Sequence, residues 1–241
     1  MALSSIYKNE VRHSNLFSTF VEEHLNRCFE TARILPKRAG ERICHQGEET
    51  QYFFIVRTGS AKQYLTAASG QEKTFRVVSP GSAIGEIEMF TNASSYACES
   101  EMVENGELFL FSMDTYMEIL QKNSIYALPL LEALSERISC QTEDIGNLSL
   151  NGAHERLSHY LYSTLECKEK SECDPDKNGC PNQERCSLTL PTSKSIIASL
   201  LSIQRETFSR TLKKMKEQEL IEVEKNQINI LDLKKLRESL S

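Results

Sequence analysis

The chain has 241 residues, enough for two modest domains that each bury a core of their own. Hydrophobic residues make up 39% of it and charged residues 26%, the proportions of an ordinary water-soluble protein. No apolar run approaches the length of a membrane span, and the first residues lack the basic region and apolar stretch of a secretory signal. We therefore expect a cytoplasmic protein without a membrane partner, whose eight cysteines stay reduced unless they bind a metal or serve redox chemistry.

Charge is distributed unevenly along the chain. The whole sequence carries a formal charge of −6, from 28 Lys and Arg against 34 Asp and Glu. From Ser187 onward, ten Lys and Arg stand against seven Asp and Glu, a balance of +3 that leaves −9 for the preceding residues. A basic C-terminal part on an acidic body fits a protein that contacts phosphates through one end only.

The first half of the chain, from about residue 16 to residue 112, has the pattern of short strands joined by turns. Residues 52–56 and 107–111 are aromatic and β-branched runs of strand length. We expect a β-sandwich or barrel, preceded by a short helix over residues 16–25, where apolar residues follow helical spacing. Glycines punctuate the strand-like runs at Gly40, Gly47, Gly59, Gly70, Gly81 and Gly85.

Residues 127–148 change to a helical period. Their apolar side chains are spaced alternately four and three residues apart, with one polar residue in the same row. This heptad seam fits either an amphipathic helix packed on its own domain or a two-helix dimer interface. We favour the interface because the narrow seam persists for three heptads, and we expect Pro129 in the first turns of the helix. The expected interface residues are Leu131, Leu134, Ile138, Gln141 and Ile145.

About the last 55 residues have the element order of a winged helix-turn-helix. In order, we expect a strand, a helix capped by Thr192 or Ser193, a tight turn, a second helix, and a hairpin that turns at Lys225 and Asn226. These elements occupy residues 188–190, 192–200, 201–203, 204–218, 220–224 and 227–230.

The second of these helices carries the residues of a DNA reader. A helix-turn-helix needs a small residue, a tight turn and an inner apolar residue, and Ala198, Ser202 and Phe208 occupy these places. Ser202 stands where glycine is preferred, because a positive φ costs free energy in a residue with a Cβ atom. Arginine can donate two hydrogen bonds to guanine, and glutamate can accept one from cytosine. The alternative interpretation of this segment is a charged helix on a solvated surface. The residues expected to contact DNA are Arg205, Glu206, Ser209, Arg210 and Lys213.

Residues 167–186 follow a helical stretch that ends at about residue 166, and they are expected to form a polar inserted loop. Its four cysteines have the spacing C-x5-C-x6-C-x5-C, a poor match to the C-x2-C pairs of zinc sites, although part of it resembles the cysteine loop of iron–sulfur-sensing winged-helix repressors. The thiolates fit three alternatives: an iron–sulfur cluster or other metal, a disulfide-forming redox switch, or no role. These cysteines are Cys167, Cys173, Cys180 and Cys186; the scattered Cys28, Cys44, Cys98 and Cys140 are expected to be ordinary buried thiols.

Residues 187–241 resemble the DNA-binding domain of the CRP/FNR family of bacterial regulators. The segment Arg205–Arg210 is similar to that family's recognition-helix pattern, Arg-Glu-Thr-hydrophobic-small-Arg. The resemblance extends over nearly the whole chain, because the heptad segment matches the family's dimerisation helix, although the cysteine insertion does not match. The glycine framework of the family's β-roll is matched by Gly40, Gly47, Gly59, Pro80-Gly81 and Gly85-Glu86.

The resemblance implies an α+β protein in three parts. These are a cyclic-nucleotide-binding-like β-roll (a double-stranded β-helix) with its leading helix over residues 1–112, a long dimerisation helix over 113–150, and a winged helix-turn-helix domain over 151–241. It also implies a homodimer that binds a two-fold-symmetric site in double-stranded DNA, with TGTGA as our hypothesis for the half-site. RNA polymerase is the implied protein partner if the regulator is an activator.

The sensor of cyclic-AMP-binding members carries a Gly-Glu pair and, about nine residues later, an Arg-Ser pair whose arginine neutralises the phosphate. Here Gly85 and Glu86 are present, but Ser95 and Tyr96 stand in place of the Arg-Ser pair. These four residues form the candidate effector pocket, and the missing guanidinium disfavours cyclic AMP as the effector.

Two classes of function remain in view. The leading hypothesis is a transcription regulator that responds to a small effector or a redox signal through its sensor domain or cysteine loop. The alternative is a cyclic-nucleotide-binding-like module that acts on a protein partner, which leaves the Arg-Glu-Thr helix without a purpose. An enzyme is not expected, because no Ser/His/Asp arrangement, phosphate loop or carboxylate pair occurs in a convincing context.

Overall fold

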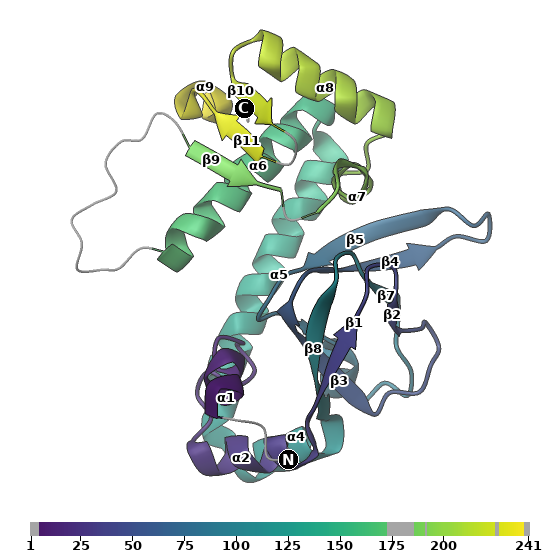
Figure 1. Cartoon of the computed structure of the whole chain (residues 1–241), viewed down its shortest axis with the longest axis vertical. Helices are drawn as coiled ribbons and strands as arrows, with labels where there is room; N and C mark the ends of the chain where they lie inside the picture. The colour runs from purple at the N-terminus through teal and green to yellow at the C-terminus, as the bar shows by residue number, and fades with distance from the viewer. Residues whose placement is uncertain (1–4, 173–185, 191, 225–226, 239–241) are drawn as a thin grey trace. The chain divides into compact units, whose positions relative to one another are not determined.

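The chain forms two compact units, Met1–Ser139 and Cys140–Ser241 (Figure 1). The first unit holds two four-stranded sheets, and the second holds a three-stranded sheet among helices, which confirms the predicted α+β class. No helix in the described part of the chain is both long and apolar enough to cross a membrane. The structure is a computed structural model, and it describes residues 5–172, 186–190, 192–224 and 227–238.

The N-terminal unit contains the predicted β-roll, built from two antiparallel sheets. Their strand orders are β1-β8-β3-β6 and β2-β7-β4-β5. The aromatic runs of β3 and β8 pair, with Phe53 opposite Phe111 and Ile55 opposite Phe109, and all four side chains are buried. Each such side chain contributes about 1.5–3 kcal/mol by leaving water, so this strand pair forms the centre of the core. The strands are β1 Arg33–Lys37, β2 Arg42–Cys44, β3 Tyr52–Thr58, β4 Ala61–Thr66, β5 Glu72–Val78, β6 Ala83–Ile84, β7 Glu99–Met102 and β8 Gly106–Ser112.

The single leading helix predicted over residues 16–25 is wrong. The chain forms two helices, α1 (Ser5–Val11) and α2 (Glu22–Thr31), with turns between them. In those turns Phe17 and Phe20 point into the aromatic core, where their ring centroids lie 4.8 Å from Phe111 and 4.4 Å from Tyr126, respectively. Burial of two aromatic rings stabilises the turns more than one extra helical turn would, so packing overrides the periodicity.

The segment 113–150, predicted as one dimerisation helix, contains two α-helices joined by a 3-10 turn. The first ends where the Asn123 side chain donates to the backbone oxygen of Ile119 at 2.8 Å. The second contains the heptad seam, with Pro129 in its first turn as expected. Amides in the first turn of a helix have no intrahelical acceptor, so the N–H that proline lacks costs no hydrogen bond there. The helices that begin in the N-terminal unit are α1 Ser5–Val11, α2 Glu22–Thr31, α3 Glu86–Thr91, α4 Met113–Lys122, η1 Ser124–Tyr126 and α5 Ala127–Leu150.

The C-terminal unit has the winged helix-turn-helix order that the sequence predicts. Its sheet has the order β10-β11-β9. Of the two residues predicted as possible caps of α7, Ser193 is the cap, because its hydroxyl oxygen accepts a hydrogen bond from the amide of Ile196. Thr192 is buried instead. The elements are α6 Ala153–Glu172, β9 Cys186–Thr189, α7 Lys194–Leu200, α8 Arg205–Glu217, β10 Ile221–Glu224, β11 Gln227–Ile230 and α9 Leu233–Glu238.

Part of the predicted cysteine loop is helical. Helix α6 runs to Glu172, so residues 167–172 continue the helix that was expected to end at about residue 166. Charged and polar residues with good helix propensity fill these positions, which lets the helix extend without an apolar face. The rest of the predicted loop, residues 173–185, and the predicted hairpin turn at 225–226 lie outside the described residues.

Candidate nucleic-acid interface and sensor cavity

The turn between α7 and α8 has the hydrogen bonds of a Schellman motif. The amide of Ile203 donates to Ala198 O at 2.9 Å, and the amide of Ser202 donates to Ser199 O at 3.1 Å. Ser202 has a φ of 54°, so the left-handed backbone expected at this position is confirmed. Ala198 and Phe208 are buried, which packs α8 against α7 with the turn as a tight hinge between them.

Helix α8 separates its side chains cleanly into two faces. The inner face consists of Phe208, Thr211, Leu212 and Met215, which are buried. The predicted DNA contacts lie on the other side of the helix, and all five are exposed: Arg205, Glu206, Ser209, Arg210 and Lys213. Their spacing of one and four residues places them on one face from the helix N-terminus onward, the end that enters the major groove in helix-turn-helix proteins.

The cations of α8 are available for contact with nucleic acid. Arg205 and Arg210 form no ion pair with any residue that the structure describes, and Arg210 donates only to the hydroxyl of Thr207 on its own helix. Lys213 lies 3.8 Å from Glu217, but both side chains are largely exposed, so this pair contributes little and exchanges readily for a phosphate. The face therefore presents free guanidinium groups at its start and lysines toward its end.

Arg156 of α6 anchors the turn, a role that the sequence analysis missed. Its Nη1 donates to the backbone oxygens of Leu201 at 3.2 Å and Ser202 at 3.4 Å, and its Nε donates to Asn151 O at 2.8 Å. These carbonyls end a helix or follow it, where no intrahelical donor is available. Arg156 is thus a positioning residue that holds the start of α8. The sequence offered no signal beyond one arginine in an otherwise mixed helix.

The row of residues predicted to form the dimer interface is divided in the structure. Leu131, Ile138 and Ile145, seven residues apart, are 58%, 63% and 65% exposed, and Gln141 is exposed beside them. Leu134 instead packs against the core of its own unit. A stripe of aliphatic side chains at heptad spacing in water costs free energy that burial against a second helix recovers.

The four residues of the predicted effector pocket have different surroundings. Tyr96 is buried, its hydroxyl donates to Tyr52 O at 2.5 Å, and burial raises its pKa. The Tyr96 ring packs on Gly85, where a Cβ atom would lie 3.2 Å from it. Ser95 pairs with Glu49 in an isolated β-bridge. Glu86 is buried and forms ion pairs, so the glutamate has charged partners that the sequence analysis did not find.

Those partners are Arg76 of β5 and Arg137 of α5. The Arg76 Nη1 lies 3.2 Å from Glu86 Oε1, and the Arg137 Nη1 bonds the same oxygen. All three line a cavity of about 320 Å³. Position 95 has no guanidinium, and the two guanidinium groups of this cavity are engaged with Glu86. The alternation of Thr74 and Val78, both buried, around Arg76 could have indicated that this arginine faces inward.

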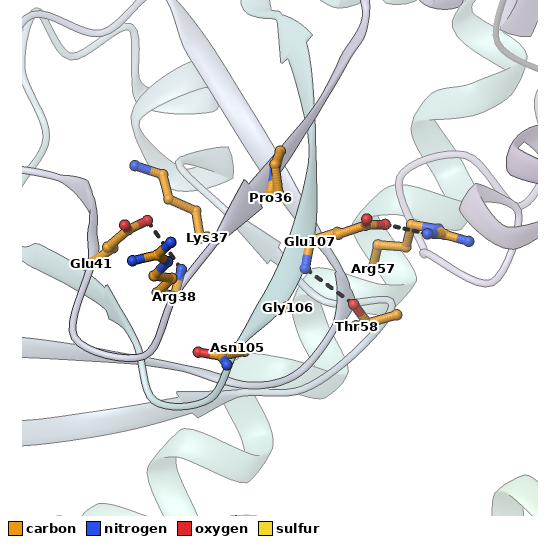
Figure 2. A pocket seen from close by; sticks show the side chains of 9 residues that line it. All are labelled: Pro36, Lys37, Arg38, Glu41, Arg57, Thr58, Asn105, Gly106 and Glu107. Carbon is orange, nitrogen blue, oxygen red and sulfur yellow. Dashed lines mark hydrogen bonds and ion pairs between the residues drawn. The ribbon is translucent and has the colours of Figure 1, made fainter.

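A larger surface cleft of about 680 Å³ lies at the ends of β1, β3 and β8 (Figure 2). Arg57 in it pairs with Glu107, as Figure 2 shows, and also with Glu10 outside the view. Hydrogen bonds to these two carboxylates raise the pKa of Arg57. The Lys37 ammonium donates to Arg42 O at 2.8 Å. Arg57 and Lys37 of this cleft therefore already have protein partners.

The cysteines divide into three groups. Cys28, Cys44 and Cys98 are buried as expected, and burial raises their pKa values to about 12, 12 and 11. Cys140 is exposed, so its expected burial is wrong: its side chain lies on a solvent-exposed side of α5. Cys167 lies in α6 and Cys186 begins β9, whereas Cys173 and Cys180 fall outside the described residues. Within the described part of the chain, no cluster of three or more His, Cys, Asp or Glu forms a metal site.

Two family models match the chain, a cyclic nucleotide-binding domain over residues 35–123 and a Crp-like helix-turn-helix domain over residues 155–239. The chain is 26% identical, over 75% of its own length and 75% of the relative's, to the probable transcriptional regulator flp of Lacticaseibacillus casei. It is similar to the structure of FixK2 from Bradyrhizobium japonicum, with a TM-score of 0.72, 18% identity, and coverage of 88% of this chain and 98% of that one. It is also similar to the structure of DNR from Pseudomonas aeruginosa, with a TM-score of 0.54, 27% identity, and coverage of 98% of this chain and 99% of that one.

A sensor domain of the cyclic-nucleotide-binding type joined to a Crp-like helix-turn-helix defines a class of DNA-binding transcription regulators. The chain belongs to the CRP/FNR family of these regulators, as its sequence motifs predicted. It is therefore a DNA-binding transcription regulator with an effector-sensing domain and not an enzyme.

Proposed function

We propose that this regulator is a homodimer that reads a two-fold-symmetric DNA site through α8. Arg205, Glu206, Ser209 and Arg210 read base edges in the major groove of each half-site, and Lys213 holds a phosphate. The observation that carries the proposal is the pair of unpaired, exposed arginines on the outer face of α8, which follows a tight Schellman turn. A half-site of the TGTGA type suits these side chains, because its guanines accept from arginine.

The exposed stripe of α5 supports the dimer. Leu131, Ile138 and Ile145 recur at a heptad period, which is the spacing of a two-helix coiled coil. A two-fold-symmetric dimer places two copies of α8 on one face of DNA, so weak half-site affinities combine into strong binding. RNA polymerase is the further partner if the bound dimer activates transcription, and the cytoplasm is the compartment in which it acts.

The signal sensed is not cyclic AMP in this proposal. Tyr96 fills the space beside Gly85, and the buried Glu86 carboxylate already has two arginine partners. A small effector of different chemistry, or a redox signal through the cysteines of residues 167–186, remains as the input. Anaerobic purification, with the visible spectrum and iron content of the protein recorded, separates an iron–sulfur cluster from a disulfide switch, since only the cluster absorbs and contains iron.

The proposal is tested by selecting DNA sites from a random pool and measuring affinity for the winning site. We expect a palindrome, and we expect Arg205→Ala combined with Arg210→Ala to weaken its binding at least about a hundredfold, since each base contact contributes about 1–3 kcal/mol. Arg237→Ala is the matched control, because it removes an exposed arginine of the same unit from α9 and should change affinity little.

Unchanged site affinity in the double variant would refute this assignment of the base-reading residues. Winning sites without a guanine–adenine core would reject the TGTGA hypothesis while leaving the interface in place. Failure to recover any DNA site, together with stable capture of another protein by the sensor unit, would favour the alternative of a module that regulates a protein partner.

A further inference from the structure

The cavity around Glu86 has an excess of buried positive charge. Arg76 and Arg137 both bond Oε1 of Glu86, and Glu86 is the acidic residue among the described residues that line the cavity. Two guanidinium groups against one carboxylate leave a balance of +1. Uncompensated charge in a half-buried site is costly, so the site favours an additional anion.

Both arginines also have hydrogen-bond donors to spare. Every bond that Arg76 makes in the described structure uses Nη1, which donates to Gln63 Oε1, Ala83 O and Glu86 Oε1. Arg137 likewise uses only Nη1. The Nε and Nη2 atoms of both residues bond no protein atom in the part of the chain that the structure describes. A guanidinium edge with two free N–H groups matches the two oxygens of a carboxylate.

The rest of the lining indicates the size and character of the ligand. The volume of about 320 Å³ lies at the lower end of small-molecule sites. Part of the lining is apolar and comes from Leu16, Leu130, Ala133 and Leu134, whereas Ser14 and Ser82 add hydroxyl groups. A ligand with an anionic group and an apolar part matches both kinds of lining residue.

We propose that this cavity binds a small organic anion of the carboxylic acid class, held through its carboxylate by Arg76 and Arg137. This rests on the proposed function and names the effector class for its sensor. The site shares only Glu86 with the pocket expected at Gly85, Glu86, Ser95 and Tyr96, and it opens between the roll, α5 and the residues that precede α2. Because Arg137 belongs to α5, the ligand shares with Glu86 an arginine of the helix that carries the heptad stripe.

The substitutions predict opposite signs, which a purely structural ion-pair network would not produce. Arg76→Gln and Arg137→Gln each remove a cation and two donors, and each should weaken anion binding about tenfold or more. Glu86→Gln removes the neighbouring negative charge and raises the local charge by one, so it should tighten binding. Arg57→Gln is the matched control: Arg57 is about as exposed as Arg137 and pairs with carboxylates, but it lies in the other cleft.

The experiment is calorimetric titration of the full-length protein, without DNA, with benzoate, hexanoate, succinate and sulfate, supported by the ligand-induced shift of thermal unfolding for each variant. We expect saturable binding of benzoate or hexanoate, weaker binding of sulfate, and the variant order given above. Equal binding by wild type and Arg137→Gln, or loss of binding in Arg57→Gln, would overturn the proposed site. Sulfate binding as tight as that of the carboxylates would overturn the organic part of the assignment.

The thermal unfolding of each variant without ligand keeps the result interpretable. If Arg76→Gln fails to fold, Arg137→Gln and Glu86→Gln still test the site from its two other elements. DNA binding is measured separately on the same preparations. Wild-type protein that binds its DNA site but none of the four anions refutes the effector site alone, whereas protein that binds the anions but no DNA refutes the proposed function alone.

Discussion

In the N-terminal unit, Arg76 and Arg137 are gathered around a buried carboxylate, whereas in the C-terminal unit Arg205 and Arg210 extend into solvent with no acidic partner that the structure describes. The same side chain thus stands in two environments. In the functions that we propose, the buried and partly satisfied arginines hold a small anion, and the exposed arginines of α8 contact highly charged DNA. Burial, which the fold decides, separates the two proposed roles.

The largest expected effect concerns α5. There the exposed side chains are apolar, unlike the exposed arginines of α8. Ile138→Glu places a charge in the heptad stripe of both copies and should dissociate the dimer. DNA affinity should fall about a hundredfold or more, because the two half-sites no longer act together. Light scattering coupled to gel filtration and a DNA-binding assay measure both effects.

Ile125→Glu is the control for that substitution. Ile125 is 77% exposed but precedes α5 and lies outside the stripe. A variant Ile138→Glu that remains dimeric, or an equal loss of dimer in Ile125→Glu, would show that the stripe is not the interface.

The buried thiols of the N-terminal unit provide a second comparison, between buried and exposed cysteines. At pH 8, Cys28, Cys44 and Cys98 should react with iodoacetamide at least about a hundredfold more slowly than Cys140, because burial blocks access and raises their pKa values to about 12, 12 and 11. Peptide mass spectrometry of timed samples measures each rate. Fast labelling of any of the three in the folded protein would contradict the packing of the N-terminal unit.

The same thiols give a pH dependence of stability. Their folded pKa values lie above that of an unfolded thiol, about 8.5. Their contribution to the free energy of unfolding is therefore complete below the pKa of the unfolded thiols. It is lost as pH rises toward the pKa values of the folded protein, because the thiols of the unfolded chain ionise first. Urea unfolding at pH 8 and pH 10 should show lower stability at the higher pH. Substituting all three cysteines by alanine should reduce this difference in stability between pH 8 and pH 10. If the difference stays the same, groups other than these thiols cause it.

Among the described arginines of the C-terminal unit, Arg156 is the one that is not fully exposed, and its removal should have a moderate effect. Arg156→Ala leaves three backbone oxygens without their donor, which should cost about 1–3 kcal/mol of stability and weaken DNA binding about tenfold through displacement of the turn. The salt dependence of DNA affinity separates this role from a phosphate contact. Lys213→Ala should reduce the salt slope by about one, while Arg156→Ala should leave it unchanged.

The smallest expected effect is at Ser202, and it is a gain. Its φ of 54° strains any residue with a Cβ atom, so Ser202→Gly should raise stability by about 0.5–1 kcal/mol with DNA affinity retained. Denaturant unfolding measures the difference. Ser202→Ala keeps the Cβ atom and should give no such gain; a gain in both variants would point to the hydroxyl group rather than the backbone.

The sequence by itself determined the elements whose signals are local. The strand runs, the heptad period, the helix-turn-helix and the Arg205–Arg210 pattern each depend on neighbours within a few residues, so periodicity and turn chemistry predict them. Even the strained backbone at Ser202 could be predicted, because a tight turn between two helices imposes it wherever that turn occurs.

Only the tertiary structure decided which polar groups meet across long sequence distances. Arg76, Glu86 and Arg137 come from a strand and two helices, and Arg156 reaches a turn 45 residues away. The aromatic core likewise replaced the expected helix over residues 16–25 by turns. Such contacts depend on strand register and helix packing, which fix where a side chain points, and no local pattern in the chain records them.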